Sequence, residues 1–227
     1  MDKKSAIILL SGGVDSVTAM AYAKREGLRL HALSFDYGQV HRLELESAKW
    51  QAISMGAATH RIIAFNMRDI GGSALTGQMD IPLNRDIEKE GLEIPKTYVP
   101  ARNTIFLSFA LSLWEVTEAQ YIYTGFNAVD YSGYPDCRPE YVRAFENMAN
   151  LATKAAIEGK RSVEIQTPLI NLTKGEIIQL GMTLGVNYAK TWSCYNPVNN
   201  NVPCGRCDSC QYRKKGFTEA AIVDPLI

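Results

Sequence analysis

The chain alternates short, uniformly apolar runs with longer segments in which apolar residues recur every three or four positions. Runs typical of parallel strands that are covered on both faces fall at residues 6–10, 28–37, 61–65, 121–124 and 163–166. Helical patterns fall at residues 15–26, 44–55, 104–117, 139–157 and 173–184. Strands that alternate with helices predict an α/β fold with a doubly wound, mostly parallel five-stranded sheet.

Local signals mark the ends of several predicted helices. Gly27 and Gly56 follow the first two, and glycine commonly ends a helix. Asn103 is placed to cap helix 104–117, which is apolar on almost every side and is therefore expected to be buried. Thr173 and Glu176 form a capping-box pattern at the start of the last helix. Residues 71–97 form a long irregular insertion, which in a compact domain is expected to be functional or mobile.

Composition narrows the class of protein. The chain has 227 residues, a length that suits one α/β domain with a small appendage, and 46% of them are hydrophobic. Lys and Arg together number 24, as do Asp and Glu, so no net charge attracts nucleic acid or a membrane surface. No apolar run approaches ~18 residues, and residues 6–10 are too short for a signal peptide. We therefore expect a cytoplasmic protein.

Ligands of doubly wound sheets bind beyond the carboxyl ends of the strands, so the turns after Leu10, Phe35 and Thr124 are where chemistry is expected. The first of these turns reads Ser11-Gly12-Gly13-Val14-Asp15-Ser16 and opens a helix. Its glycines allow backbone N–H groups to face an anion, the helix N-terminus adds its positive end, and the serines supply hydroxyl donors. The turn therefore predicts a phosphate site, although it is neither GxxxxGK[ST] nor GxGxxG.

Asp15 is the unusual residue of this phosphate loop. A carboxylate beside phosphates is repelled unless a cation lies between them, and a bridging Mg²⁺ is the natural solution. The alternative is an ordinary strand-to-helix turn in which Asp15 or Ser16 is the N-cap.

Four of the five cysteines lie close together near the end of the chain, in the pattern Cys194-x9-Cys204-x2-Cys207-x2-Cys210. Four thiolates suit a tetrahedral Zn²⁺ and leave no open position, so we expect one structural zinc ion. An iron–sulfur cluster and redox-active thiols are the alternatives. Zinc ribbons also bind nucleic acid, and the basic residues near this pattern keep that idea open.

The phosphate loop resembles that of the N-type ATP pyrophosphatases, which transfer AMP from ATP and release pyrophosphate. Further segments narrow the resemblance: residues 35–39 with His41, residues 99–103, residues 124–125, and the run Asp130-Tyr-Ser-Gly-Tyr-Pro-Asp-Cys-Arg138 before the four cysteines. Together they resemble the 7-cyano-7-deazaguanine synthase family of queuosine biosynthesis. The resemblance extends from the first strand to the last cysteine.

The resemblance implies a reaction that converts 7-carboxy-7-deazaguanine and ammonia into a nitrile at the expense of two ATP. ATP adenylates the carboxylate, ammonia displaces AMP to give an amide, and a second ATP activates the amide oxygen so that it also leaves with AMP. It further implies an ATP-binding domain over residues 1–190, a zinc-binding segment over residues 191–227 packed on that domain, and a homodimer. The expected partners are small molecules, with neither nucleic acid nor a membrane.

The resemblance also implies residue roles. Asp15, Arg102 and Lys174 would be catalytic, and Asp130, Asp136 and Arg138 would bind the deazaguanine. Zn²⁺ would be held by Cys194, Cys204, Cys207 and Cys210. ATP with Mg²⁺ would be bound along the phosphate loop and the start of its helix, at Leu10, Ser11, Gly12, Gly13, Val14, Asp15, Ser16, Val17, Thr18, Ala19 and Met20.

Each of these roles has a structural alternative. Arg102 would otherwise form a structural ion pair, Lys174 would be a solvated lysine of a first helical turn, and the two aspartates with Arg138 would only shape a turn. Phe35 lies either beside adenine or in the core, and Cys137 is expected to be an inert buried thiol. At the level of function, the alternatives are a tRNA-modifying adenylating enzyme and a zinc-ribbon nucleotide sensor.

Overall fold

The computed structural model describes residues 3–77, 79–87, 94–129 and 134–226. Its centre is a five-stranded sheet in the order β3-β2-β1-β4-β5, in which every neighbouring pair is parallel. The strands are β1 (Ser5–Leu9), β2 (Arg29–Asp36), β3 (Thr59–Ala64), β4 (Tyr121–Tyr123) and β5 (Glu164–Gln166). The predicted α/β class and parallel sheet are therefore confirmed. Because the strand order reverses beside β1, the switch point lies between β1 and β4.

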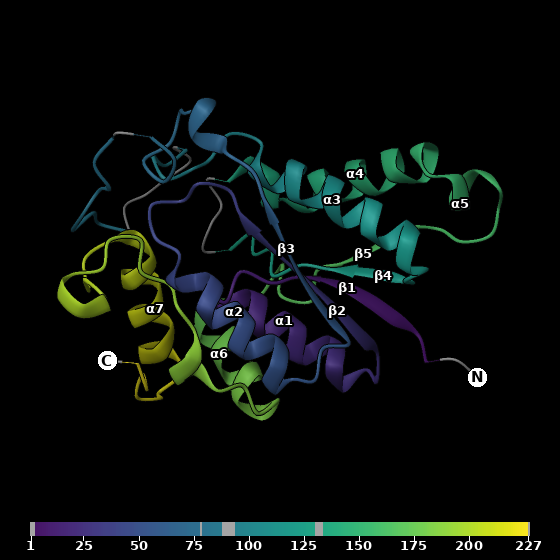
Figure 1. The fold of residues 1–227 in the computed structure, drawn as a ribbon. Coiled ribbons are helices and arrows are strands. Elements are labelled where there is room, and N and C mark those ends of the chain that lie inside the picture. The colour runs from purple at the N-terminus through teal and green to yellow at the C-terminus, as the bar shows by residue number, and fades with distance from the viewer. Residues whose placement is uncertain (1–2, 78, 88–93, 130–133, 227) are drawn as a thin grey trace.

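Helices cover both faces of the sheet (Figure 1). One layer contains α1 (Val14–Arg25), α2 (Leu43–Ser54) and α6 (Lys174–Thr183). The opposite layer contains α3 (Arg102–Thr117), α4 (Pro139–Ala152) and α5 (Lys154–Ile157). The last helix, α7 (Asp208–Glu219), packs beside α6.

The alternation of side chains along β1 builds two separate cores. Ile8 points into the core beneath α1 and α6, where it joins Met20 and Ile177. Ile7 points the other way, into the core beneath α3, with Trp114. All five apolar side chains are fully buried, as expected where a central parallel strand is covered by helices on both faces.

Three local predictions are wrong. The helix predicted at 139–157 breaks at Thr153, whose backbone is extended, and the N–H of Ala155 beyond the break donates to Glu115 Oε1 at 3.0 Å. Asn103 does not cap α3, because the helix begins at Arg102 with Ala101 as its N-cap, so Asn103 lies inside the first turn. Nor is α3 buried all round, since Val116 is 72% exposed.

The C-terminal segment packs against the α1–α6 side of the domain and carries α7, which the sequence analysis did not predict. The Phe217 ring contacts the Tyr188 ring edge-on, with centroids 5.6 Å apart. Arg213, 3% exposed, forms a bidentate ion pair with Asp224 at 2.7 and 2.8 Å. This pair fixes the end of the described chain onto α7.

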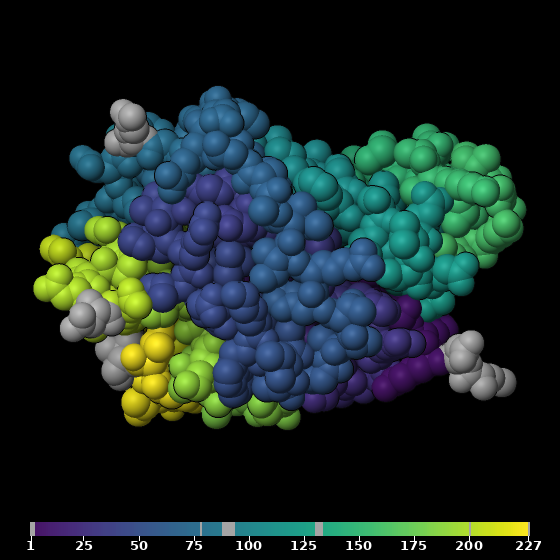
Figure 2. Space-filling model, viewed as in Figure 1, coloured from purple at the N-terminus to yellow at the C-terminus, as the bar shows by residue number. Residues whose placement is uncertain are grey.

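The described part of the insertion lies beside the cysteine segment (Figure 2). Leu83 forms an antiparallel bridge with Cys207, and the Asn84 N–H donates to the Arg206 carbonyl at 2.8 Å. Arg85 forms an ion pair with Asp208 at 3.1 Å. The insertion is thus attached at residues 83–85 to the segment that carries the cysteines.

None of the helices formed by the described residues combines the length and apolar character needed to cross a membrane.

Candidate active site

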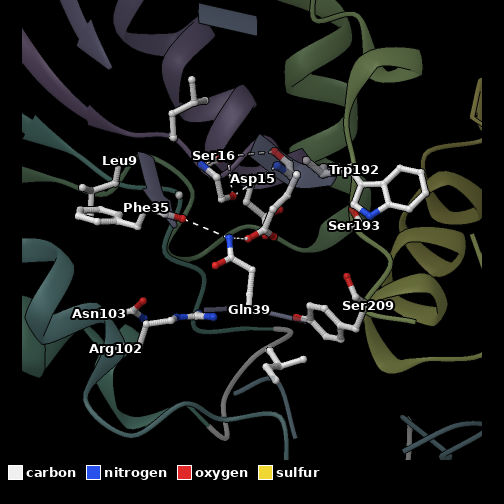
Figure 3. Close-up of a pocket in the computed structure, with 18 of the residues that line it drawn as sticks. Leu9, Asp15, Ser16, Phe35, Gln39, Arg102, Asn103, Trp192, Ser193 and Ser209 are labelled. Carbon is white, nitrogen blue, oxygen red and sulfur yellow. Dashed lines mark hydrogen bonds between the residues drawn. The ribbon is translucent and has the colours of Figure 1, made fainter. Parts of the chain in front are cut away.

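A cavity of about 240 Å³ lies at the carboxyl ends of β1, β2 and β4, where the sequence predicts the chemistry. Figure 3 shows Asp15 and Ser16 on one side of it, Arg102 and Asn103 on the other, and Gln39 reaching in between them. Residues that follow all three strands line it, together with Lys174 at the start of α6 and residues 192–195 of the cysteine segment. The switch point of the sheet is therefore the site.

The phosphate loop is organised around one hydroxyl. Ser16 Oγ accepts hydrogen bonds from the N–H groups of Ser11 and Gly12, both at 3.2 Å, and lies 3.1 Å from the Gly13 carbonyl, to which it donates. Ser16 thus shapes the loop from within. The N-cap of α1 is Gly13, not Asp15 or Ser16, and it makes no side-chain capping bond. The first amides of α1 remain available to an outside acceptor such as phosphate.

Neighbouring backbone leaves no room for a side chain at two glycines, one in the loop and one beside it. Gly12 has φ +87°, and a Cβ there would collide with the carbonyl oxygen of Glu44 at the start of α2. At the end of β4, a Cβ on Gly125 would lie 2.7 Å from Ser16 N. The loop is therefore held between α2 and the turn after β4, and both glycines are required by close approach.

Part of the predicted nucleotide-binding range lines the cavity. Leu10, Ser11, Gly13, Val14, Asp15 and Ser16 line the cavity, whereas Gly12 does not. Val17, Thr18, Ala19 and Met20 are 0% exposed, and the three apolar ones belong to the first core. The Thr18 hydroxyl hydrogen-bonds Tyr188 Oη at 2.7 Å. These four residues lie in the buried part of α1 that follows the loop, and they do not line the cavity.

Asp15 and Lys174 form the central ion pair of the site. Lys174 Nζ lies 2.6 and 2.7 Å from the two carboxylate oxygens of Asp15, although the two residues are 159 positions apart. Lys174 is 3% exposed, so the interpretation as a solvated lysine is wrong. The capping box that starts α6 is confirmed, because Thr173 Oγ1 and the Glu176 carboxylate each accept the other's backbone N–H. That cap holds Lys174 at the first turn, beside the phosphate loop.

Arg102 lines the opposite side of the cavity, at the start of α3. Its guanidinium lies 3.4 Å from Tyr37 Oη and 5.8 Å from the centroids of the Tyr37 and Phe106 rings. Its Nε is buried without a hydrogen-bond partner, and it forms no ion pair with any described residue. The interpretation as a structural ion pair is therefore not supported. Burial lowers the pKa of Arg102, but nearby phenols and Asp136 outweigh that effect and raise it, so the group is a permanent cation that faces the cavity.

The predicted deazaguanine-binding residues do not line the cavity where they are described. Asp136 is buried, and its Oδ2 accepts the N–H of Asn103 at 3.1 Å, so it serves α3 as the cap that the sequence assigned to Asn103. Arg138 is the N-cap residue of α4 and is half-buried. Asp130 lies outside the described residues. From this segment the residues that line the cavity are Tyr134 and Cys137.

Cys137 is an inert thiol by its surroundings. Burial, with Asp136 nearby, raises the pKa of its thiol to about 12, so it is protonated at neutral pH.

Phe35, at the end of β2, stacks on Phe106 with ring centroids 4.0 Å apart and an interplanar angle of 8°. Its ring is thus committed to the core at the wall of the cavity.

Glu44 is the acidic residue of the site that the sequence analysis missed. It lines the cavity from the first turn of α2, and Gln39 Nε2 donates to its Oε1 at 3.0 Å. Burial raises the pKa of Glu44 to about 7, against the opposing effects of Arg102 and the Gln39 hydrogen bond. No local signal separates Glu44 from Glu46, which is exposed two residues later, because only the tertiary fold turns one of them inward.

The four cysteines lie together beside this cavity. Their sulfur atoms all lie within 4.8 Å of one another, and Cys204 Sγ and Cys210 Sγ are 3.9 Å apart. A tetrahedral zinc with Zn–S bonds of ~2.3 Å needs sulfur atoms ~3.8 Å apart, so the cluster fits such an ion. Backbone N–H groups point at two of the sulfurs: Cys204 N lies 3.2 Å from Cys194 Sγ, and Cys207 N lies 3.3 Å from Cys204 Sγ. Such donors favour thiolates, the form that binds metal.

The cysteine segment is joined directly to the phosphate loop. The Trp192 N–H donates to the Gly12 carbonyl at 3.0 Å, two residues before Cys194. Ser47 Oγ of α2 lies 2.7 Å from the same carbonyl. The cluster therefore fixes one wall of the cavity and, through Trp192, the backbone of the loop.

Comparison with known proteins completes this picture. Residues 5–221 match the family described as "Queuosine biosynthesis protein QueC".

The chain belongs to the QueC family.

Curated relatives agree with this assignment. The "7-cyano-7-deazaguanine synthase" of Desulfatibacillum aliphaticivorans is 58% identical over 99% of this chain and 97% of its own length. That of Syntrophus aciditrophicus is 57% identical over 98% and 96%. The resemblance expected from the sequence is confirmed.

A solved structure has a similar fold. NMN synthetase from Francisella tularensis superposes with a TM-score of 0.51, covering 97% of this chain and 79% of that chain, at 16% sequence identity. At this identity the likeness concerns the fold alone. It shows that the QueC sheet and its helices follow an architecture found in another synthetase.

Proposed function

We propose that this protein is a 7-cyano-7-deazaguanine synthase, which converts 7-carboxy-7-deazaguanine, ammonia and two ATP into 7-cyano-7-deazaguanine, two AMP and two pyrophosphates. Membership of the QueC family supports the activity. The observation that carries it is the arrangement of the cavity, with a phosphate loop and a buried lysine at one end and an unpaired arginine at the other. Such a cavity suits a triphosphate and a carboxylate that meet in the middle.

The phosphate loop would hold the pyrophosphate that leaves. The first amides of α1 and the cation of Lys174 face the charge that grows on the leaving group, and they are in place before reaction. Donors fixed in advance stabilise a transition state more than solvent does. Asp15, with its carboxylate in the cavity, would hold Mg²⁺, which supplies charge neutralisation between the phosphates.

Arg102 would bind the carboxylate of the substrate or the α-phosphate that it attacks. Its Nε is buried and lacks an acceptor, a state that costs free energy until an anion binds. A guanidinium also suits a planar carboxylate, because it can donate two parallel hydrogen bonds. Asp136 positions this group by capping α3 at Asn103.

Carboxylate and amide oxygens are both poor leaving groups, and adenylation makes each of them a good one. Ammonia attacks the acyl adenylate, the C–O bond to AMP breaks, and the amide results. Attack of the amide oxygen on a second ATP repeats the activation in the same cavity. A bound zinc would act structurally, since four sulfur ligands leave no position for substrate.

The tRNA-modifying and nucleotide-sensor hypotheses lack a comparable observation. The relatives that match nearly the whole chain carry the synthase name. The homodimer and the cytoplasmic location stay predictions.

The experiment that tests the activity is mass spectrometry of the products after incubation with 7-carboxy-7-deazaguanine, ATP, Mg²⁺ and ammonium. We expect the nitrile, with two AMP and no ADP for each molecule formed. ATP turnover that depends on tRNA, or ATP binding without release of pyrophosphate, would contradict the proposal in favour of one of the two alternatives.

A further inference from the structure

Glu44 is a carboxyl group of the cavity that neither phosphate binding nor carboxylate binding requires. Its main chain packs against Gly12 of the phosphate loop, and its side chain lines the cavity from the first turn of α2. It therefore lies where the phosphates and the reacting group are expected to meet.

Gln39 fixes the role of the Glu44 carboxyl. Gln39 Oε1 accepts the N–H of Tyr37 at 2.8 Å, and its Nε2 donates to the Phe35 carbonyl at 3.2 Å and to Glu44 Oε1 at 3.0 Å. Because the amide oxygen is already used by a backbone donor, the amide cannot flip, and it can only donate to Glu44. Oε1 is thus held as an acceptor. No described residue forms a hydrogen bond with Oε2, which is left as the atom that can take a proton.

The charges around Glu44 come from every element that borders the cavity. Arg102 faces it from α3 and lowers its pKa, as does the hydrogen bond from Gln39, while burial has the larger effect and raises the pKa to about 7. The other titratable groups that line the cavity are Asp15, Tyr37, His41, Tyr134, Cys137, Lys174, Cys194, Tyr195 and Arg213. A carboxyl group in this environment exchanges its proton near neutral pH, as a general base requires.

We propose that Glu44 is the base that removes the N–H proton when the adenylated amide collapses to the nitrile, an inference that rests on the proposed function. In this step the C–O bond to AMP breaks and its electron pair leaves with AMP. The N–H bond breaks, and its electron pair becomes the third bond between carbon and nitrogen. The proton passes to Glu44 and from there to solvent, so no further reactant is needed.

The test separates this step from adenylation with the variant Glu44→Gln. Supplied with the isolated amide and ATP, the variant is expected to form nitrile about 10²–10⁴-fold more slowly than the wild type. Supplied with the carboxylate and ATP without ammonium, it is expected to release pyrophosphate within about threefold of the wild-type rate, because adenylation removes no proton from nitrogen. Glu46→Gln is the matched control on the same helix, since Glu46 is exposed and pairs with Lys49.

The pH profile supplies a second readout that needs no variant. Wild-type conversion of the amide should rise with pH through a midpoint near 7, as Glu44 loses its proton, and level off above it. The rate of Glu44→Gln should not rise with pH in this range. Glu44→Asp should recover part of the wild-type rate, and its rate should still rise with pH.

Two results would overturn the inference: nitrile formation from the amide at the wild-type rate in Glu44→Gln, or an equal loss of both steps, which would make Glu44 a substrate-binding residue only. Failure of the proposed function would look different, because the wild type itself would release no pyrophosphate with the carboxylate.

Discussion

Replacing Asp15 by asparagine is expected to lower nitrile formation by at least about 10³-fold. Asparagine keeps the size of the side chain but removes the charge that holds Mg²⁺ beside the phosphates. It also removes the carboxylate charge that lies 2.6 Å from the buried Lys174 cation. Both the adenylation of the carboxylate and that of the amide should fail. Steady-state kinetics and exchange of labelled pyrophosphate into ATP measure the two losses.

The loss of activity in Asp15→Asn must be separated from a loss of stability. Breaking this partly buried pair should cost on the order of 2 kcal/mol, or roughly 5 °C in Tm for a chain of this size. Asp224→Asn is the matched control, because it breaks the ion pair of Arg213, which is as buried as Lys174, by changing a residue that does not line the cavity. The control should lose similar stability and keep its activity within a few-fold. Substantial turnover by Asp15→Asn would contradict the Mg²⁺ role.

The variant Cys207→Ser is expected to lose the metal and, with it, the order of the C-terminal segment. Cys207 is 0% exposed at the centre of the cluster and is bridged to Leu83 of the insertion. A serine hydroxyl does not replace a thiolate ligand, so zinc content should fall from one ion per chain to nearly none. Because metal binding stabilises the folded state, we expect Tm to fall by ~10 °C or more.

The cysteine outside the cluster provides the control. Cys137 contacts Asn103, whose Nδ2 lies 3.2 Å from its sulfur, and takes no part in the four-sulfur group. Cys137→Ser should therefore keep its zinc. Metal analysis and differential scanning calorimetry of both variants test the account. An unchanged zinc content in Cys207→Ser would contradict the four-sulfur site, and iron with sulfide in the wild type would favour the iron–sulfur alternative.

Features encoded by short stretches of sequence could be predicted. The apolar run of β1 identifies a strand covered on both faces, and the glycines after it identify the phosphate loop. The spacing of the cysteines predicts their convergence. Each depends on residues within one short stretch of the chain, the longest being the cysteine segment from Cys194 to Cys210, so local patterns are sufficient.

Features that depend on distant residues could not be predicted. The pairing of Asp15 with Lys174, 159 positions away, decides whether that lysine is buried or solvated. Glu115 accepts the N–H of Ala155 and so helps to start a new helix after Thr153. Asp136 caps α3 in place of Asn103. In each case a partner from another element overrides a local preference that is worth less than the tertiary contact.

The central claim is that both oxygens of the substrate carboxylate leave on AMP, and an isotope experiment tests it most directly. The substrate is prepared with ¹⁸O at both carboxylate positions and converted to nitrile by the wild-type protein, and the nucleotide products are analysed by mass spectrometry. We expect two AMP molecules with one ¹⁸O each for every nitrile, and unlabelled pyrophosphate. Label in inorganic phosphate or pyrophosphate, or AMP without label, would contradict the account.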